Sequence, residues 1–258
     1  DAFWECNILE HIEFADKSHL QSIGNNAFCE TKLREISLPS TTKLRNKWLS
    51  STHIYLANVI QMKEQNIISY NNEFILSKSD PTCTFYDTLV FASRDLGHAI
   101  IPPFIKKIAS YAFANCILLE SIDFPGDSQL EEIDEVAFYG SGVEIFTLPS
   151  HVKYIRIESF ARCDFIRELD LSHNYELKTI DSSAFAFSSI EKIILPSCIE
   201  KINGSFLHKT DEFKTIEVVD CDVKNIIFYK NQFIIGKSDL KSDIFDTLFY
   251  FNSKEKIH

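Results

Sequence analysis

The sequence contains few of the residues that interrupt or bend a chain. Its 258 residues include seven glycines, seven prolines and one methionine, and no low-complexity stretch marks a flexible linker. No apolar run approaches the roughly 20 residues that a membrane-spanning helix needs. Positive charge is also scarce: the chain has 26 lysines and arginines against 37 aspartates and glutamates, for a net charge of −11. This balance argues against nucleic acid, whose binding depends on clustered Lys and Arg, and against an anionic membrane surface. The lack of a long apolar run argues against membrane insertion.

Cysteine pairs with the spacing of a metal or redox site are missing too. None of the seven cysteines belongs to a C-x-x-C pair, and no zinc spacing is present. Three of them, Cys6, Cys116 and Cys163, lie three residues after a phenylalanine of the repeat described below, where a small buried residue fits a turn. The others are Cys29, Cys83, Cys198 and Cys221. We therefore predict a protein of free thiols, without metal or cofactor.

A recurring Ala/Ser-Phe pair is the dominant pattern of the chain. The phenylalanines of these pairs are Phe3, Phe28, Phe113, Phe138, Phe160, Phe185 and Phe206. They are 25, 85, 25, 22, 25 and 21 residues apart. A period in the low twenties is typical of a solenoid, in which each unit buries its apolar side chains only against its neighbours.

Each repeat unit has two halves. The first reads apolar-x-x-apolar-x-apolar, as in Leu119 to Pro125, and its alternation predicts a short strand that proline often ends. The second, as in Leu130 to Phe138, has apolar residues at i, i+3 and i+8. That spacing favours an extended stretch followed by one helical turn. The fold class predicted is α/β: a β-rich solenoid with short helical turns on its convex side.

A larger repeat is superimposed on the small one. Residues 66–91 match residues 225–250 at an offset of 159, with 13 of 26 positions identical. Both copies read as strand, polar turn and strand, which predicts two inserted β-hairpins within embellished units at 50–98 and 207–252. We predict one solenoid domain over residues 1–258. Both ends fall inside a repeat, so a fragment of a longer protein is expected.

The inward positions of the strands repeat from unit to unit, whereas the outward positions vary. The outward positions are therefore the candidates for a surface that binds a partner. The candidates are His98, Ile100, Ser121, Asp123, Ile145, Thr147, Glu168, Asp170, Lys192 and Ile194. Outward apolar residues such as Ile145 and Ile194 either meet a partner or are covered by a neighbouring segment. Glu168 and Asp170 are two carboxylates, but an open sheet gives no reason for the raised pKa that a general acid needs.

The repeat resembles the BspA-like leucine-rich-repeat family. The resemblance rests on Ile23-Gly24-Asn-Asn-Ala27-Phe28 and on Ala112-Phe113-Ala-Asn-Cys116, which runs on to Leu119, Ile122, Phe124 and Pro125. It implies a leucine-rich-repeat solenoid with a parallel sheet on its concave face, in a cell-surface or secreted protein that mediates adhesion or host contact. The inserted hairpin and residues 99–108 look like proteins of this family in mucosal parasitic protists. The resemblance implies no enzyme activity.

Three hypotheses follow for the function. The first is a non-enzymatic interaction module that binds a protein or an extracellular-matrix component. The second is a structural spacer or self-associating scaffold, and the third, more remote, is a hydrolase that uses Glu168 and Asp170. Asn203-Gly-Ser205 is a lone glycosylation sequon whose residues the repeat also explains.

Overall fold

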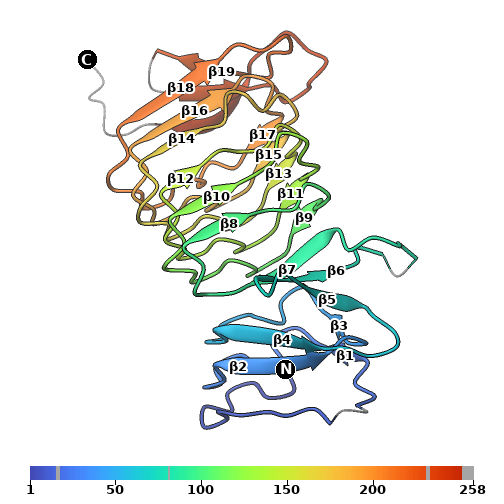
Figure 1. The fold of residues 1–258 in the computed structure, drawn as a ribbon. Coiled ribbons are helices and arrows are strands. Elements are labelled where there is room, and N and C mark those ends of the chain that lie inside the picture. Colours follow the sequence, from blue (N-terminus) through green and yellow to red (C-terminus); the bar gives the residue numbers. More distant parts are fainter. Residues whose placement is uncertain (16–17, 81, 231–232, 252–258) are drawn as a thin grey trace.

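The computed structural model describes residues 1–15, 18–80, 82–230 and 233–251 and shows a stack of coils (Figure 1). One side of the stack carries the strands that the repeat predicts: β2 (Glu35–Pro39), β4 (Leu56–Ile60), β8 (His98–Ile100), β10 (Ser121–Asp123), β12 (Ile145–Phe146), β14 (Glu168–Asp170), β16 (Lys192–Pro196) and β18 (Thr215–Val219). We call the outward side of these strands the repeat-strand face.

A second set of short strands forms the opposite side: β1 (Ser22–Ile23), β3 (Lys43–Leu44), β9 (Lys107–Ile108), β11 (Glu132–Ile133), β13 (Tyr154–Ile155), β15 (Thr179–Ile180) and β17 (Lys201–Ile202). Strands of successive coils pair in parallel on both sides, as with Ile122 and Phe146, or Ile133 and Ile155. Parallel pairing places equivalent residues of successive coils beside one another, so the interior is built of rows of the same repeat position.

The predicted helical turns are wrong, because no helix occurs in the described residues. In five coils the residues two before and two after the phenylalanine have positive φ, as do Val136 (62°) and Gly140 (63°) around Phe138. Left-handed residues at this spacing cannot belong to a right-handed helix. The backbone N–H groups instead donate to carbonyls of the next coil. Phe138 donates to Ser159 at 2.7 Å, and Gly140 donates to Ala161 at 2.9 Å. The result is a stack of hydrogen-bonded turns.

The phenylalanine rings form the central row of the interior. Phe113, Phe138 and Phe160 stack with centroids 4.9 and 5.0 Å apart. In the gap of 85 residues after Phe28, one coil has Trp48 and Leu49 where other coils have Ala or Ser and Phe. The backbone N–H of Thr52 donates to the carbonyl of Leu49, as that of Ser141 does to Phe138. Trp48, which is 2% exposed, lies 6.4 Å from the ring of Phe91. A search for Phe alone misses this coil.

Two antiparallel three-stranded units interrupt the coils. The first consists of β5 (Ile67–Tyr70), β6 (Phe74–Ser77) and β7 (Thr88–Ala92), and the second of β19 (Ile226–Tyr229), β20 (Phe233–Gly236) and β21 (Thr247–Phe251). The first lies across the stack in Figure 1 and joins the coil sheet, since β7 pairs in parallel with β9. We call these units the first and second hairpin.

The first hairpin divides the interior into two apolar clusters. Ile75 and Phe91 pack with the N-terminal coils, while Phe74, Leu76 and Leu89 pack with the coils that follow. The ring of Phe74 lies 6.2 Å from the ring of Phe113. Trp48 belongs to the other cluster, on the opposite side of the first hairpin. Both faces of this hairpin are therefore buried inside the stack.

The Lys-Ser-Asp and Asp-Thr-Leu motifs shared by the two hairpins close the same loop. The backbone N–H and hydroxyl of Ser79 donate to the carboxylate of Asp87 at 2.8 and 2.7 Å. Ser238 makes the same two bonds to Asp246 at 2.8 and 2.6 Å. The identity between the copies therefore serves the connection between two strands, and neither motif needs a ligand to explain it.

Candidate functional site

The ten candidate residues lie on strands of the repeat-strand face or directly after one. Strand register places His98, Ser121 and Ile145 side by side on β8, β10 and β12. Glu168 and Lys192 are neighbours on β14 and β16, and Asp170 and Ile194 are neighbours one step further along. Thr147 follows the end of β12 and is exposed.

The polar candidates are largely engaged with one another. His98 contacts the hydroxyl of Ser121 at 2.7 Å and the carboxylate of Asp123 at 3.5 Å. Lys192 lies between Glu168 at 3.4 Å and Glu217 of β18 at 3.1 Å. The hydrogen bond to Glu217 outweighs burial and raises the pKa of Lys192, so the ammonium group of Lys192 is charged at neutral pH.

The two carboxylates of the hydrolase hypothesis do not have the properties of an acid–base pair. Burial raises the pKa of Asp170, but the hydroxyl and the backbone N–H of Ser172 donate to the carboxylate and leave the pKa below its ordinary value. A general acid needs a pKa raised toward neutrality. Glu168 is exposed and paired with Lys192, so its charge is already satisfied.

The repeat-strand face is broken between β12 and β14. Strands β8, β10 and β12 form one three-stranded sheet, and β14, β16 and β18 form another. Within residues 143–172, all of which the structure describes, no backbone hydrogen bond joins the two sheets. On the opposite side the ladder continues without interruption from β13 to β15. The coils therefore separate only on the repeat-strand face.

A shallow groove of about 410 Å³ lies at this break. Its lining residues are Glu144, Ile145, Phe146, Phe165, Arg167, Glu168 and Asp170. Ile145 is 69% exposed and Phe165 is also exposed, so an apolar surface faces solvent here. Three carboxylates border it against one guanidinium, and Arg167 donates to the carbonyl of Ser189 at 3.3 Å. The groove is thus apolar in its middle and acidic at its rim.

Phe146 differs from its equivalents beside the break. The inward residue at its position is aliphatic in the other strands of these two sheets, from Ala99 of β8 to Ile216 of β18. The ring of Phe146 packs edge-on against the stacked rings of Phe138 and Phe160, with centroids 5.7 and 4.8 Å away. A ring occupies more volume than the aliphatic chain that replaces it elsewhere, and this bulk lies at the strand where the sheet is broken.

Ile145 and Ile194 differ in exposure, although both were predicted to be outward apolar residues. Ile194 is 9% exposed, so its neighbours already cover it. Ile145 has no strand on its open side. Phe165 was not selected from the sequence, because it precedes the strand pattern. Its only sequence signal is a large apolar residue at a position where the repeat does not require one.

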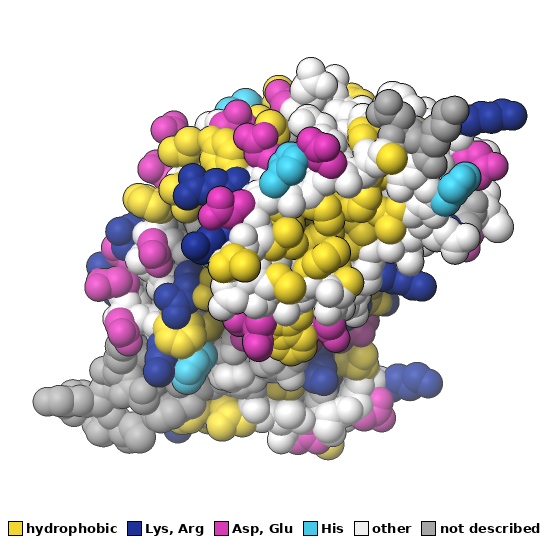
Figure 2. All heavy atoms as spheres, turned by 90° about the horizontal axis from the view of Figure 1, so that it is seen from below, with side chains coloured by type: hydrophobic (Ala, Val, Ile, Leu, Met, Phe, Trp, Pro, Cys, Tyr) yellow, Lys and Arg dark blue, Asp and Glu magenta, His cyan; other side chains and the backbone are white. Residues whose placement is uncertain are grey.

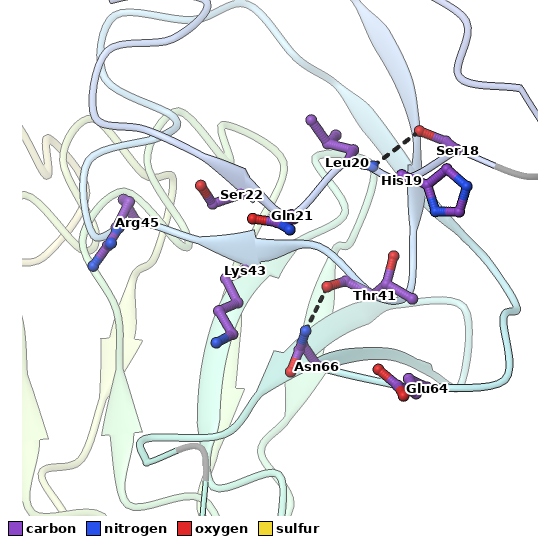
Figure 3. Close-up of a pocket in the computed structure, with 10 residues that line it drawn as sticks. All are labelled: Ser18, His19, Leu20, Gln21, Ser22, Thr41, Lys43, Arg45, Glu64 and Asn66. Atoms are coloured by element: carbon purple, nitrogen blue, oxygen red, sulfur yellow. Dashed lines mark hydrogen bonds between the residues drawn. The ribbon is translucent and has the colours of Figure 1, made fainter.

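Two further hollows lie in the N-terminal coils, and both are polar. The hollow in Figure 3, about 570 Å³, lies beside β1 and β3, and Arg45 stands apart from the other side chains there. A broader one of about 1030 Å³ on the repeat-strand face is lined by Glu10, His11, Lys32, Arg34, Glu35, His53 and Tyr55. In the described part of the chain, no three His, Cys, Asp or Glu residues are placed to hold a metal ion. A search of the same residues found no helix long and apolar enough to span a bilayer.

Two of the three cysteines at the repeat position are buried as predicted, Cys116 and Cys163, whereas Cys6 of the first coil is half-buried. Burial raises the pKa of Cys163 to about 12. All seven cysteines are free thiols. Cys198 and Cys221 lie at equivalent positions of successive coils, two residues beyond the last pair of β16 and β18, which the sequence prediction did not anticipate. Their separation of 23 residues, one repeat period, was the available signal.

Comparisons with known proteins agree with this architecture. A model of the BspA-type leucine-rich-repeat region matches six copies over residues 1–78 and 85–214. The fold is similar to that of a leucine-rich cell-surface protein from Faecalibacterium prausnitzii (19% identity, TM-score 0.63, covering 81% of this chain and 53% of that one). It is also similar to the pneumococcal vaccine antigen PcpA (19%, 0.68, 83% and 52%) and to a leucine-rich-repeat protein from Eubacterium ventriosum (17%, 0.66, 83% and 55%). The chain spans about half the length of each. A search of curated proteins found no match.

Proposed function

Because the chain belongs to the BspA-type leucine-rich-repeat family, we propose that it is a non-enzymatic interaction module. Its contact surface is the groove between β12 and β14, and its partner is a protein or an extracellular-matrix component. The groove supports this assignment because it combines an exposed apolar floor with the facing edges of two separate sheets. Exposed apolar surface bordered by polar groups is typical of a binding site.

The chemistry of the groove favours one kind of partner. Ile145 and Phe165 suit an aromatic or branched aliphatic side chain, and Glu144, Glu168 and Asp170 favour lysine or arginine beside it. The facing edges of β12 and β14 lack a neighbouring strand, so an extended segment can also offer backbone hydrogen bonds. An extended, apolar and basic segment of another protein fits all three features.

A matched pair of substitutions tests the proposal. A random peptide library is selected against the chain, and the enriched peptides are measured with the variants Ile145→Ser and Ile117→Ser. Both isoleucines are about equally exposed, 69% and 70%, but Ile117 lies outside the groove. We expect Ile145→Ser to weaken binding about tenfold, or about 1.4 kcal/mol, with no change for Ile117→Ser. Equal effects of the two variants would exclude the groove as the contact surface.

Location at the cell surface, adhesion and host contact form part of the same proposal. They are supported by the family, and by two structural neighbours, a cell-surface protein and a vaccine antigen. The neighbours are bacterial, so the protist resemblance of the inserted hairpin stays a prediction. Protease treatment of intact source cells tests the location, since a protein inside the cell resists digestion until the cells are lysed.

Self-association is the second candidate, and one observation favours it. Seen from the N-terminal end (Figure 2), apolar side chains gather at the end of the stack, and Phe3, Trp4 and Ile8 of the first coil are exposed. In a stack of repeats such a surface is normally covered by another coil. Sedimentation over a range of concentrations decides the matter: a dimer that Trp4→Ser dissociates supports self-association, and a monomer at all concentrations excludes it.

A further inference from the structure

Cys198 and Cys221 occupy equivalent positions in successive coils. Strands β16 and β18 pair in parallel as far as Pro196 and Val219, and each cysteine lies two residues beyond that pair. Adjacent parallel strands are about 4.8 Å apart. A disulfide requires Cα atoms about 4.4 to 6.8 Å apart. Continuation of the register therefore brings the two cysteines within the span of a disulfide.

Hydrogen bonds fix the backbone around both residues. The backbone N–H of Ser197 donates to the carbonyl of Val219 at 2.8 Å, which extends the ladder past its last pair. The hydroxyl of Ser197 accepts the N–H of Cys221 at 2.8 Å. The side-chain amide of Asn225 donates to the carbonyl of Cys198 at 2.7 Å. Both thiols are partly exposed, so a reagent in solution can reach them.

The first hairpin has the same framework without the thiols. Ser40 donates to Ile60 at 2.9 Å, and its hydroxyl accepts the N–H of Met62 at 2.9 Å. The positions of Cys198 and Cys221 are held there by Thr41 and Met62. The geometry that brings the two chains together is thus a property of the repeat, and the pair of thiols is particular to the second copy.

We propose that Cys198 and Cys221 form an intramolecular disulfide that fastens the last coils at the base of the second hairpin. The oxidant is a small disulfide such as oxidised glutathione. The thiolate of Cys221 attacks one of its sulfurs, forming a mixed disulfide and releasing one thiol. The thiolate of Cys198 then attacks the sulfur of Cys221 and releases the second thiol. Two thiols of the protein lose two protons and two electrons, and the oxidant gains them.

The environment of Cys198 sets the order of these steps. Burial and the adjoining Cys221 thiol raise the pKa of Cys198 to about 12, so it is protonated at neutral pH. Its Sγ lies 3.4 Å from the carbonyl of Tyr175. Cys198 is therefore the thiol that reacts second, when the mixed disulfide is already next to it. Ring closure is faster at higher pH, because the attacking species is the thiolate.

The full chain in a glutathione redox buffer tests the proposal. We expect the number of reactive thiols to fall by two, and peptide mapping without reductant to recover one linked pair that contains Cys198 and Cys221. The melting temperature of the oxidised chain is expected to rise by several degrees over the reduced chain, because the bond closes a loop of one coil. Cys198→Ser and Cys221→Ser should each abolish the rise.

Two controls separate this pair from general thiol oxidation. Cys6 and Cys29 are also 23 residues apart, but they hold different repeat positions, three residues after Phe3 and one residue after Phe28. Cys29 is also buried, so they should not be linked. Thr41→Cys with Met62→Cys, made in the chain that lacks Cys198 and Cys221, should restore a linked pair at the first hairpin. An unchanged number of thiols, a link within another pair, or links only between molecules would overturn the proposal.

Discussion

Leu89 of the first hairpin is 0% exposed, whereas its equivalent in the second hairpin, Leu248, is 59% exposed. The two hairpins have the same strands, the same loop closure and an irregularity in register at equivalent residues, Ile75/Leu76 and Ile234/Ile235. They differ in what covers them. Coils pack on both faces of the first, while among the described residues the coils cover only one face of the second. Repetition of sequence therefore fixes the local fold, and position in the stack fixes the burial.

Truncation of the two equivalent leucines should give the largest difference. Leu89→Ala removes buried methyl groups and leaves a cavity, for an expected loss of about 2 to 5 kcal/mol in the free energy of unfolding. Leu248→Ala should change it by about 0.5 kcal/mol or less. Equilibrium unfolding in urea measures both. Losses of equal size would show that the second hairpin is covered in solution.

Exchange of one residue between the copies should have an intermediate effect. The position of Ser77 in the first hairpin is held by Gly236 in the second, and a Cβ there would lie 2.0 Å from the ring of Phe249. Gly236→Ser should therefore destabilise the chain by about 1 to 3 kcal/mol through overpacking. Phe249→Val, which restores the pair of the first copy with Val90, should rescue it. A double variant no more stable than Gly236→Ser would contradict this account.

Removal of the loop-closing carboxylate should give the smallest effects and a pH dependence. Asp87→Ala removes the carboxylate that accepts two hydrogen bonds from Ser79. Because Ser79 is exposed and its donors can bind water instead, the expected cost is about 0.5 to 1.5 kcal/mol, and Asp246→Ala at the exposed copy should cost less. The hydroxyl and backbone N–H of Ser238 lower the pKa of Asp246. The contribution of Asp246 is then complete above the ordinary aspartate pKa of about 3.9 and is lost as pH falls through the folded value.

The amide signal of Ser238, followed by NMR as the pH is lowered, reports this titration. It should move with a midpoint below pH 3.9 in the wild-type chain and show no such transition in Asp246→Ala. A midpoint above that value would contradict the hydrogen bonds seen to its carboxylate.

The repeat and the β-rich solenoid were predictable, because burial requires the same apolar positions in each coil. The turns that stand in place of the expected helical turns were not predictable, since apolar spacing says nothing about the left-handed residues at Val136 and Gly140, which accompany hydrogen bonds between coils. The groove was missed for a related reason. Phe146 fits the apolar pattern as well as isoleucine does, so the pattern does not mark the strand at which the sheet is broken. Cys198 and Cys221 were missed because their spacing was compared with motifs and not with the repeat period.

The position of the first hairpin between two apolar clusters bears on how the stack unfolds. Its two faces belong to different apolar clusters, so the coils before it and those after it form two units of cooperative unfolding, each with its own free energy. Hydrogen exchange should show two levels of protection that meet at β6. Ile145 and Phe165 of the proposed contact groove lie in the C-terminal unit, so the proposed partner recognition should persist when thermal opening or proteolysis removes the N-terminal coils.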